Sequence, residues 1–559
     1  LWHMQTCTVC SKQFVITVED VGFLKKFNVP APRTCTDCRV MQMMCFRNER
    51  IFYQSSCAWC KKSMVSCFSP TSPFTILCNT CWWSDECDVL KYGRDFDFTR
   101  PFFEQWFDLL KVVPMGNVFI GLAENADYTN YGVSNKNCYM VTASDYNQDS
   151  FYADNANENK DCCDITFSNK SELLYECVDS AGSYSCAYSQ NLKNCNFCSF
   201  CVDCIGCSDC IGCVGLRSAQ YRVFNKQYSK EQYKEEVLKL RLNTTSGREA
   251  FAKRFKEFLL TQPRKCTNNM NVENCRGNYI VNSKNCVNCF DMYDCEDCRN
   301  TMFGFQAKTV YNSYGTTYSE LMYLAAACVK TYNMRCSAVV WPATSNVDYS
   351  FLIRGAKNCF GCISLKKNEY CILNKQYTKE EYEKLIPKIL EHMMKAGELG
   401  EFFPMKYAPW AYNETVAYDY YPKSRDEIAK LGARWEENTP GSFGKETRAT
   451  LPDTITEVSF DIEREVFACE CSRCTGFHDK KCGRNFKVVK QEFSFYKNQN
   501  IPLPLMCPTC RYRQRVFLRN PRKLWERPCA ACGVSCETVY APTRPEKVYC
   551  EACYQKDLG

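Results

Sequence analysis

Pairs of cysteines separated by two residues stand near the start of the chain and have the spacing of metal ligands. The tight turn of a Cys-x-x-Cys segment brings both sulfurs to one ion, and two such pairs supply the four thiolates that tetrahedral zinc takes. Four pairs of this kind come first: Cys7, Cys10, Cys35, Cys38, Cys57, Cys60, Cys78 and Cys81. We predict that the first four residues bind one zinc ion and the last four bind another.

The same cysteine module recurs at the other end of the chain, 472 residues later, so that Cys10 corresponds to Cys482. The repeat predicts two further zinc sites, built from Cys482, Cys507, Cys510, Cys529, Cys532, Cys550 and Cys553. Catalytic zinc usually has histidine or carboxylate ligands and an open position. Because the chain holds 3 histidines in all, we expect about four closed, structural zinc ions.

One ligand of the repeated module is not fixed by the alignment. Cys7 maps onto Asp479, which follows an inserted segment. We expect Cys474 to reach over this insert and join Cys482, with Cys471, His478 and Asp479 as alternatives. The sequence leaves this choice open.

Several segments around these cysteines resemble a known family. They include Cys7-Thr-Val-Cys10, Cys35-Thr-Asp-Cys38-Arg39, Phe46-Arg-Asn-Glu-Arg50 and, near the end, Arg519-Asn-Pro-Arg-Lys-Leu-Trp525. They are similar to the probable zinc-ribbon domain and to an uncharacterised zinc-ribbon family common in small-genome candidate-phylum bacteria. The resemblance covers nearly the whole chain and implies a bacterial zinc protein. It implies no activity.

The middle of the chain contains a second duplication. Asn225-Lys-Gln-Tyr228 recurs 149 residues later as Asn374-Lys-Gln-Tyr377. Each copy precedes a predicted helix with a capping box, formed by Ser229 and Gln232 or by Thr378 and Glu381. Ahead of each copy, cysteines recur every nine residues, as in Cys177, Cys186, Cys195, Cys204 and Cys213.

A nine-residue period is typical of solenoids in which two units make one turn. We therefore predict short parallel β-solenoids over residues 120–228 and 266–377, each closed by a capping helix. Cysteine packs well as a small buried group, so the regular spacing favours interior ladders over metal binding by these thiols. Soft-metal binding is the alternative.

The predicted fold class is mainly β: a duplicated cysteine-rich parallel β-solenoid flanked by tandem zinc ribbons. A helix over Thr99 to Leu110, with an aromatic stripe, is expected to dock the first zinc module on the solenoid. We predict five domains. They are a zinc module (1–95), the docking helix with the first solenoid (96–262), the second solenoid (263–400), an aromatic-rich connector (401–465) and a second zinc module (466–559).

The strongest functional signal is a basic segment between the last two zinc sites. Guanidinium groups pair with phosphates, and aromatic rings stack on unpaired bases. Together with Arg47 at the other end, it supplies the predicted nucleic-acid contacts: Arg511, Arg513, Arg515, Arg519, Arg522, Lys523 and Trp525. The alternative is a solvated basic face that offsets the charge of the zinc thiolates. The net charge of +7 is too small to decide between nucleic-acid binding and a solvated basic face.

The sequence shows no phosphate loop, nucleotide-binding glycine motif or nucleophile elbow, so we expect no enzyme. Neither a signal peptide nor a membrane span is expected, which together with the cysteine content favours the cytoplasm.

The leading hypothesis for the function is binding of RNA or DNA, with the ribosome as one setting. A protein interaction scaffold is the alternative, and a thiol-rich metal buffer is the third. The oligomeric state is left open.

Overall fold

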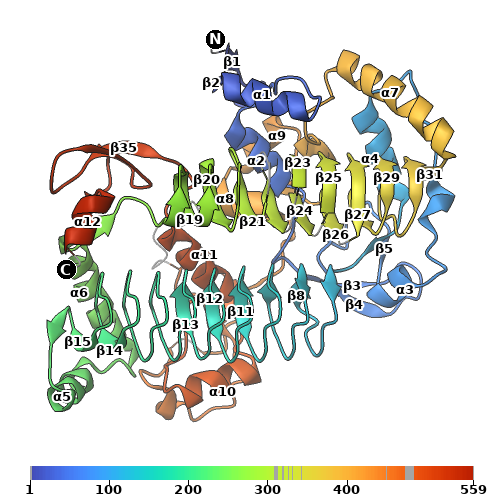
Figure 1. Cartoon of the computed structure of the whole chain (residues 1–559). Helices are drawn as coiled ribbons and strands as arrows, with labels where there is room; N and C mark the ends of the chain where they lie inside the picture. Colours follow the sequence, from blue (N-terminus) through green and yellow to red (C-terminus); the bar gives the residue numbers. More distant parts are fainter. Residues whose placement is uncertain are drawn as a thin grey trace. The chain divides into compact units, whose positions relative to one another are not determined.

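The structure is a computed structural model that describes residues 3–307, 313–317, 320–324, 326–329, 331–341, 343–448, 450–471, 482 and 484–557 (Figure 1). The chain forms two compact units, and each unit joins two segments that are distant in sequence. Unit 1 is Leu1–Val118 with Thr267–Thr439, and unit 2 is Phe119–Cys266 with Pro440–Gly559. Among the described helices, none combines the length and the apolar character needed to span a membrane.

Unit 2 contains a stack of short parallel strands, here called the first ladder. Each strand pairs with the strand one turn further along the chain, as Phe151 with Cys163 and Cys163 with Tyr175. Isolated parallel bridges such as Val178 with Gln190 continue the same offset of twelve between the longer strands. The strands are β7 (Ile120–Gly121), β8 (Thr129–Asn130), β9 (Gly132–Val133), β10 (Val141–Thr142), β11 (Phe151–Asp154), β12 (Cys163–Thr166), β13 (Tyr175–Val178), β14 (Ser208–Ile211) and β15 (Gln220–Val223).

The backbone of this ladder turns a corner every third residue. Asn191, Asn194 and Phe197 all have φ near +50°, in the left-handed region. The residue after each corner is buried, as Cys195 and Cys198 are at 0 % exposure. The predicted turn of two nine-residue units is therefore wrong, because paired strands are offset by twelve and one turn has four corners. Nine is a multiple of three, so cysteines nine apart are all interior, although they do not lie on strands that pair.

Unit 1 contains the second ladder, which has two parallel sheets. The offset of twelve recurs, with eleven between Met270 and Val281 and thirteen between Thr331 and Thr344. One sheet holds β18 (Met270–Glu273), β19 (Arg276–Lys284), β20 (Val287–Tyr293), β21 (Met302–Phe305), β22 (Tyr314–Thr317), β24 (Ala326–Val329), β26 (Ala338–Trp341) and β28 (Phe351–Arg354). The other holds β23 (Glu320–Tyr323), β25 (Thr331–Arg335), β27 (Thr344–Asp348), β29 (Lys357–Phe360) and β30 (Glu369–Ile372).

Each ladder ends in the same hairpin, which explains the repeated Asn-Lys-Gln-Tyr segment. The last strand turns back into β16 (Lys226–Gln227) or β31 (Lys375–Gln376). The Asn225 side chain bonds both the N–H and the carbonyl of Val214, at 2.9 and 3.0 Å. Asn374 bonds those of Ile363 at 2.8 and 2.9 Å. The amide thus satisfies backbone groups that no further strand reaches.

The predicted helices follow these hairpins. Helices α5 (Lys230–Leu240) and α7 (Lys379–Ala396) begin with the expected capping boxes. Two more helices cover the ladders. Helix α4 (Phe102–Val112) lies on the second ladder, and α6 (Thr245–Thr261) lies on the first.

Helices α4 and α6 occupy equivalent positions in the second duplication. Phe102 contacts Tyr349 at 5.4 Å between ring centroids, and Phe251 contacts Phe200 at 5.0 Å. The helix that contains Phe102 therefore packs on the second ladder and not on the first cysteine array, which follows it in the chain. The aromatic face of α4 is complementary to rings of the second ladder, which no local pattern reveals.

The two cysteine modules have the same order of elements. The N-terminal module contains β1 (His3–Thr6), β2 (Gln13–Ile16), α1 (Val18–Lys26), α2 (Thr36–Met44), β3 (Tyr53–Ser56), β4 (Ser63–Ser66), β5 (Ile76–Leu77) and α3 (Asn79–Trp83). The C-terminal module contains β33 (Phe467–Ala468), β34 (Arg484–Phe486), α10 (Lys490–Asn498), α11 (Pro508–Leu518), β35 (Trp525–Pro528), β36 (Ser535–Thr538), β37 (Lys547–Tyr549) and α12 (Glu551–Asp557).

Short elements connect the modules to the ladders. Strand β5 pairs with β6 (Met115–Gly116), and β37 pairs with β17 (Pro263–Lys265), so these contacts also repeat in both duplications. The connector of unit 1 contains α8 (Val416–Tyr420) and α9 (Arg425–Lys430), and α9 begins at the predicted Ser424 and Glu427 capping box. Strand β32 (Ser442–Phe443) pairs with β34 in unit 2. The predicted domain boundaries stay a prediction.

Candidate metal centres

Four groups of four cysteines come together in the described part of the chain. Within each group, the Sγ atoms all lie within 4.8 Å of one another. Two groups belong to the N-terminal module: Cys7, Cys10, Cys35 and Cys38, and Cys57, Cys60, Cys78 and Cys81. Two belong to the C-terminal module: Cys469, Cys482, Cys507 and Cys510, and Cys529, Cys532, Cys550 and Cys553. Each group could hold one metal ion.

The sulfur separations fit a tetrahedral ion. The Sγ atoms of Cys10 and Cys35 are 3.7 Å apart, and those of Cys60 and Cys78 are 3.8 Å apart. The C-terminal groups give 3.7 Å for Cys482–Cys507 and 3.9 Å for Cys532–Cys550. Four sulfurs at about 2.3 Å from a central ion lie about 3.8 Å from one another.

In three of the groups one pair lies at a hairpin turn, and in all four the other pair lies at the start of a helix. Cys35, Cys78 and Cys507 are the N-cap residues of α2, α3 and α11. The positive end of a helix favours a thiolate, which is the ligand form of cysteine. A hydrogen bond from Cys38 lowers the pKa of Cys35 to about 5. The same contact raises the pKa of Cys38, so only one thiol of this pair is favoured as a thiolate.

In the described residues, Cys469 completes the cluster that contains Cys482. Its N–H donates to the carbonyl of Arg484 at 2.9 Å, as that of Cys7 does to Lys12. Its sulfur accepts from the N–H of Cys507 at 3.1 Å, as that of Cys7 accepts from Cys35 at 3.3 Å. Cys469 thus occupies the position of Cys7, with a longer segment before the next ligand.

None of the residues proposed from the sequence for this position is among the four sulfurs of the described cluster. Cys474, His478 and Asp479 lie outside the described residues. The sulfur of Cys471 accepts from the N–H of Cys482 at 2.7 Å but is not one of the four. Sequence reasoning passed over Cys469 because it did not allow the insert to begin directly after this residue.

The cysteines inside the ladders belong to none of the four groups. Their thiols donate to backbone carbonyls, as Cys195 does to Cys204 at 3.4 Å and Cys198 to Cys207 at 3.6 Å. These bonds satisfy the buried S–H groups and suit the packing role. No disulfide joins the described cysteines.

The basic segment of the C-terminal module is largely buried. Arg511 and Arg515 are each 1 % exposed and lie against the first ladder. Arg511 forms ion pairs with Asp164 and Glu492, both at 3.0 Å. Arg515 bonds Asp164 at 2.8 Å and approaches Glu176 at 3.5 Å. These guanidinium groups hold the module to the ladder, and their predicted contact with nucleic acid stays a prediction.

Two further arginines that were predicted to contact nucleic acid also form ion pairs within their own units. Arg519 pairs with Asp179 at 3.0 Å and lies 3.8 Å from the ring centroid of Phe167. Its N-terminal counterpart Arg47 pairs with Glu49 and lies 5.5 Å from the ring centroid of Tyr314. Both side chains are about nine-tenths buried. They dock a cysteine module on a ladder, which explains why both ends share this arginine.

The remaining members of the predicted surface are more accessible. Arg513, Arg522 and Trp525 are partly buried, and Lys523 is exposed. The Lys523 ammonium lies 5.4 Å from the ring centroid of Trp525. The sequence missed the acidic partners because Asp164 and Glu176 are far from this segment along the chain.

Burial shifts the titration of these acids. Burial and then the neighbouring Asp164 raise the pKa of Glu176 to about 7, against the lowering effect of Arg515. Burial also raises the pKa of Glu492, against the attraction of Arg511.

Comparison of the chain with protein-family models and with curated proteins found no match.

Proposed function

We propose that the protein is a non-catalytic scaffold whose four metal centres bind zinc and have a structural role. The complete set of four sulfurs in each centre supports this, because it leaves no open position for a substrate. Soft thiolates in a tetrahedron select zinc among the common divalent ions. We place the protein in the cytoplasm, where such thiols stay reduced. Membership of the zinc-ribbon family remains part of the proposal.

We further propose that each ladder is a short β-solenoid. The constant parallel offset, the corner at every third residue and the hairpin that ends each ladder support this assignment. The interior accepts small residues, since a turn with three residues on each side leaves little room. Solenoids offer long, regular faces that suit protein partners.

The scaffold hypothesis replaces nucleic-acid binding as the leading one. The observation that carries it is the burial of Arg511 and Arg515 at 1 % exposure in ion pairs with the ladder. A phosphate contact would need these pairs to open, and a buried pair that loses one partner costs about 3–5 kcal/mol. Nucleic-acid binding then rests on Lys523, Trp525 and their partly buried neighbours.

Metal analysis and nucleic-acid titration test the proposal together. We expect four zinc ions per chain and no steep loss of RNA or DNA binding between about 50 and 200 mM salt. Substitution of Lys523 and Trp525 by alanine is then without effect. A steep salt dependence that vanishes in this variant returns nucleic-acid binding to first place. Well over four readily released ions per chain indicates a metal buffer.

A further inference from the structure

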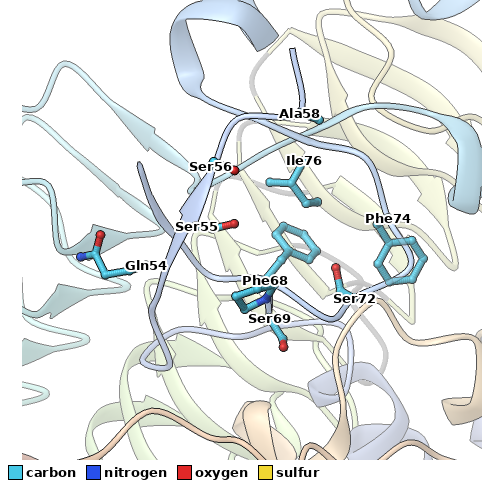
Figure 2. A pocket seen from close by; sticks show the side chains of 10 residues that line it. Gln54, Ser55, Ser56, Ala58, Phe68, Ser69, Ser72, Phe74 and Ile76 are labelled. Atoms are coloured by element: carbon cyan, nitrogen blue, oxygen red, sulfur yellow. The ribbon is translucent and has the colours of Figure 1, made fainter. Parts of the chain in front are cut away.

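An open groove of about 460 Å³ lies beside the second metal centre of the N-terminal module (Figure 2). Ser55 on β3 lies on one side, and Ser72 and Phe74 lie on the other. The groove is lined by Gln54, Ser55, Ser56, Ala58, Phe68, Ser69, Pro70, Ser72, Phe74 and Ile76. None of these side chains is charged.

The C-terminal module has the same backbone at the equivalent place. Its loop Pro542-Thr-Arg-Pro545 matches Pro70-Thr-Ser-Pro73, 472 residues apart. The N–H of Ser72 donates to Ser69 at 2.9 Å, and that of Arg544 donates to Ala541 at 2.9 Å. Both loops therefore present their carbonyls in the same way.

In the C-terminal module, an arginine crosses this space. Arg527 stands where the N-terminal module has Ser55. Its Nη1 donates to the carbonyl of Ala541 at 3.3 Å, and its Nη2 donates to that of Glu546 at 3.2 Å. The equivalent carbonyls of the N-terminal module belong to Ser69 and Phe74. A serine side chain is too short to reach them.

We propose that the groove binds the guanidinium group of an arginine supplied by a partner protein. Arginine carries five N–H donors in a planar fork, which matches carbonyls on one wall and serine hydroxyls on the other. Phe74 already contacts one guanidinium group, that of Arg434, whose Cζ lies 5.4 Å from the ring centroid. The groove of the N-terminal module thus lacks the side chain that its counterpart carries, and a partner provides it.

Glu436 beside the groove carries a charge that suits this ligand, whereas the Glu414 carboxylate is buried and accepts from Tyr53 and Ala411. A second hollow shares Phe68, Ser69 and Ser72 with the groove and is lined also by Glu414 and Glu436. A carboxylate oxygen of Glu436 accepts from the Thr71 hydroxyl at 3.2 Å, on the same loop. Arg434 lines this hollow too, but its Nη2 donates to the carbonyls of Ala408 and Pro409 at 3.0 and 2.6 Å.

Short peptides test the groove directly in the full, zinc-loaded chain. The probe is acetyl-Gly-Arg-Gly-amide, with the citrulline and lysine analogues as comparisons, and binding is measured by calorimetry. We expect one site per chain. Citrulline keeps the shape but loses the charge, so its peptide should bind about tenfold more weakly or worse. Equal binding of arginine and citrulline peptides overturns the proposal, as does no binding of the arginine peptide at millimolar concentration.

Two substitutions locate the site. Ser55→Arg copies the C-terminal module and should fill the groove, lowering peptide affinity at least about tenfold, whereas Ser55→Ala should bind normally. Arg527→Ser opens the counterpart and should raise the stoichiometry from one to two. Zinc content and circular dichroism confirm folding. Unchanged binding by Ser55→Arg overturns the assignment.

The inference rests on the scaffold function, yet the two can fail separately. Free peptides report on the groove alone, whereas the metal and nucleic-acid measurements report on the scaffold. If the chain holds four zinc ions and shows no salt-dependent nucleic-acid binding but binds no peptide, only the groove proposal fails. Peptide binding by a chain that also binds RNA removes the scaffold as the sole function.

Discussion

At the scale of single residues, the fourth ligand beside Cys482 makes the first prediction. Cys469→Ser removes one of four sulfurs that lie within 4.8 Å of one another. We expect the zinc content to fall from four ions per chain to about three, because three thiolates hold zinc less tightly. Mass spectrometry of the desalted protein measures this. Cys474→Ser is the matched control, and a lost ion in that variant instead would restore the assignment made from the sequence.

Glu176 gives a prediction about pH. Its pKa is raised to about 7 in the folded chain, first by burial and then by Asp164, whereas an unfolded chain has a value of about 4.3. The protonated form therefore stabilises the fold below about pH 4.3, and this stability is lost as the pH rises through 7. Glu176→Gln should gain roughly 1–3 kcal/mol relative to the native chain between pH 5 and 7. Urea unfolding at several pH values measures the difference. A difference that stays constant with pH contradicts the prediction.

The residues also show why the sequence predicts the cysteine clusters but not the surroundings of the arginines. A Cys-x-x-Cys pair is a local geometry, so its spacing alone predicts that both sulfurs face one ion. The environment of Arg511 and Arg515 depends on Asp164, which only the folded chain brings within 3.0 Å. Alternating basic and aromatic residues look alike on a free surface and at a buried interface.

At the scale of elements, the contact of α11 with β12 depends on Asp164. This carboxylate accepts a hydrogen bond from Arg515 at 2.8 Å and forms an ion pair with Arg511 at 3.0 Å. Asp164→Ser leaves two buried guanidinium groups without it and should cost about 3–5 kcal/mol. Arg515→Met, which copies Met43 of the other module, leaves Asp164 paired with Arg511 and should cost less. Denaturant unfolding of both variants measures which one loses more unfolding free energy, and a larger loss in Arg515→Met contradicts the prediction.

Two glycines allow α4 and α6 to approach the ladders. A Cβ on Gly361 would lie 2.9 Å from the Phe102 ring, and one on Gly212 would lie 2.7 Å from that of Phe251. Both glycines have φ near +65°, which also disfavours other residues. We expect Gly212→Ala and Gly361→Ala each to cost about 1–3 kcal/mol. Hydrogen exchange should show faster exchange in the helix that faces the substituted glycine. Gly533→Ala, where nothing lies within 4 Å of an added Cβ, is the control for backbone strain alone.

The sequence indicated the parallel strands, the repeated Asn-Lys-Gln-Tyr segment and the helices after it, yet it misjudged the repeat within each ladder. Cysteines nine apart, such as Cys195 and Cys204, suggested stacking at that distance. In the structure they share an interior in which each third residue points inward, and the backbone pairs at an offset of twelve. A pattern of side chains reports which positions are buried but not how many corners make a turn.

At the scale of the whole molecule, each half of the chain contributes elements to both units, an arrangement here called the exchange. Each copy of the second duplication begins with α4 or α6 and continues into the first or second ladder. Helix α4 precedes the first ladder but packs on the second, and α6 precedes the second ladder but packs on the first. The cysteine modules follow the same rule, since each unit combines one module with the ladder farther from it in sequence. Repeats in a sequence show which segments are alike and not which of them pair.

This exchange predicts how the chain behaves when it is divided. A break between Cys266 and Thr267 places part of each unit on either fragment, because unit 1 ends its first segment at Val118 and unit 2 resumes at Pro440. The first fragment then lacks the ladder on which α4 packs, and neither fragment can bury its docking arginines alone. We expect the coexpressed fragments to form a 1:1 complex with four zinc ions, and each fragment by itself to aggregate. Light scattering with metal analysis measures both. A break between Thr439 and Pro440 is the control: residues 1–439 retain all of unit 1 and should bind two zinc ions without the other fragment. Two separate, well-folded fragments from the first break would contradict the exchange.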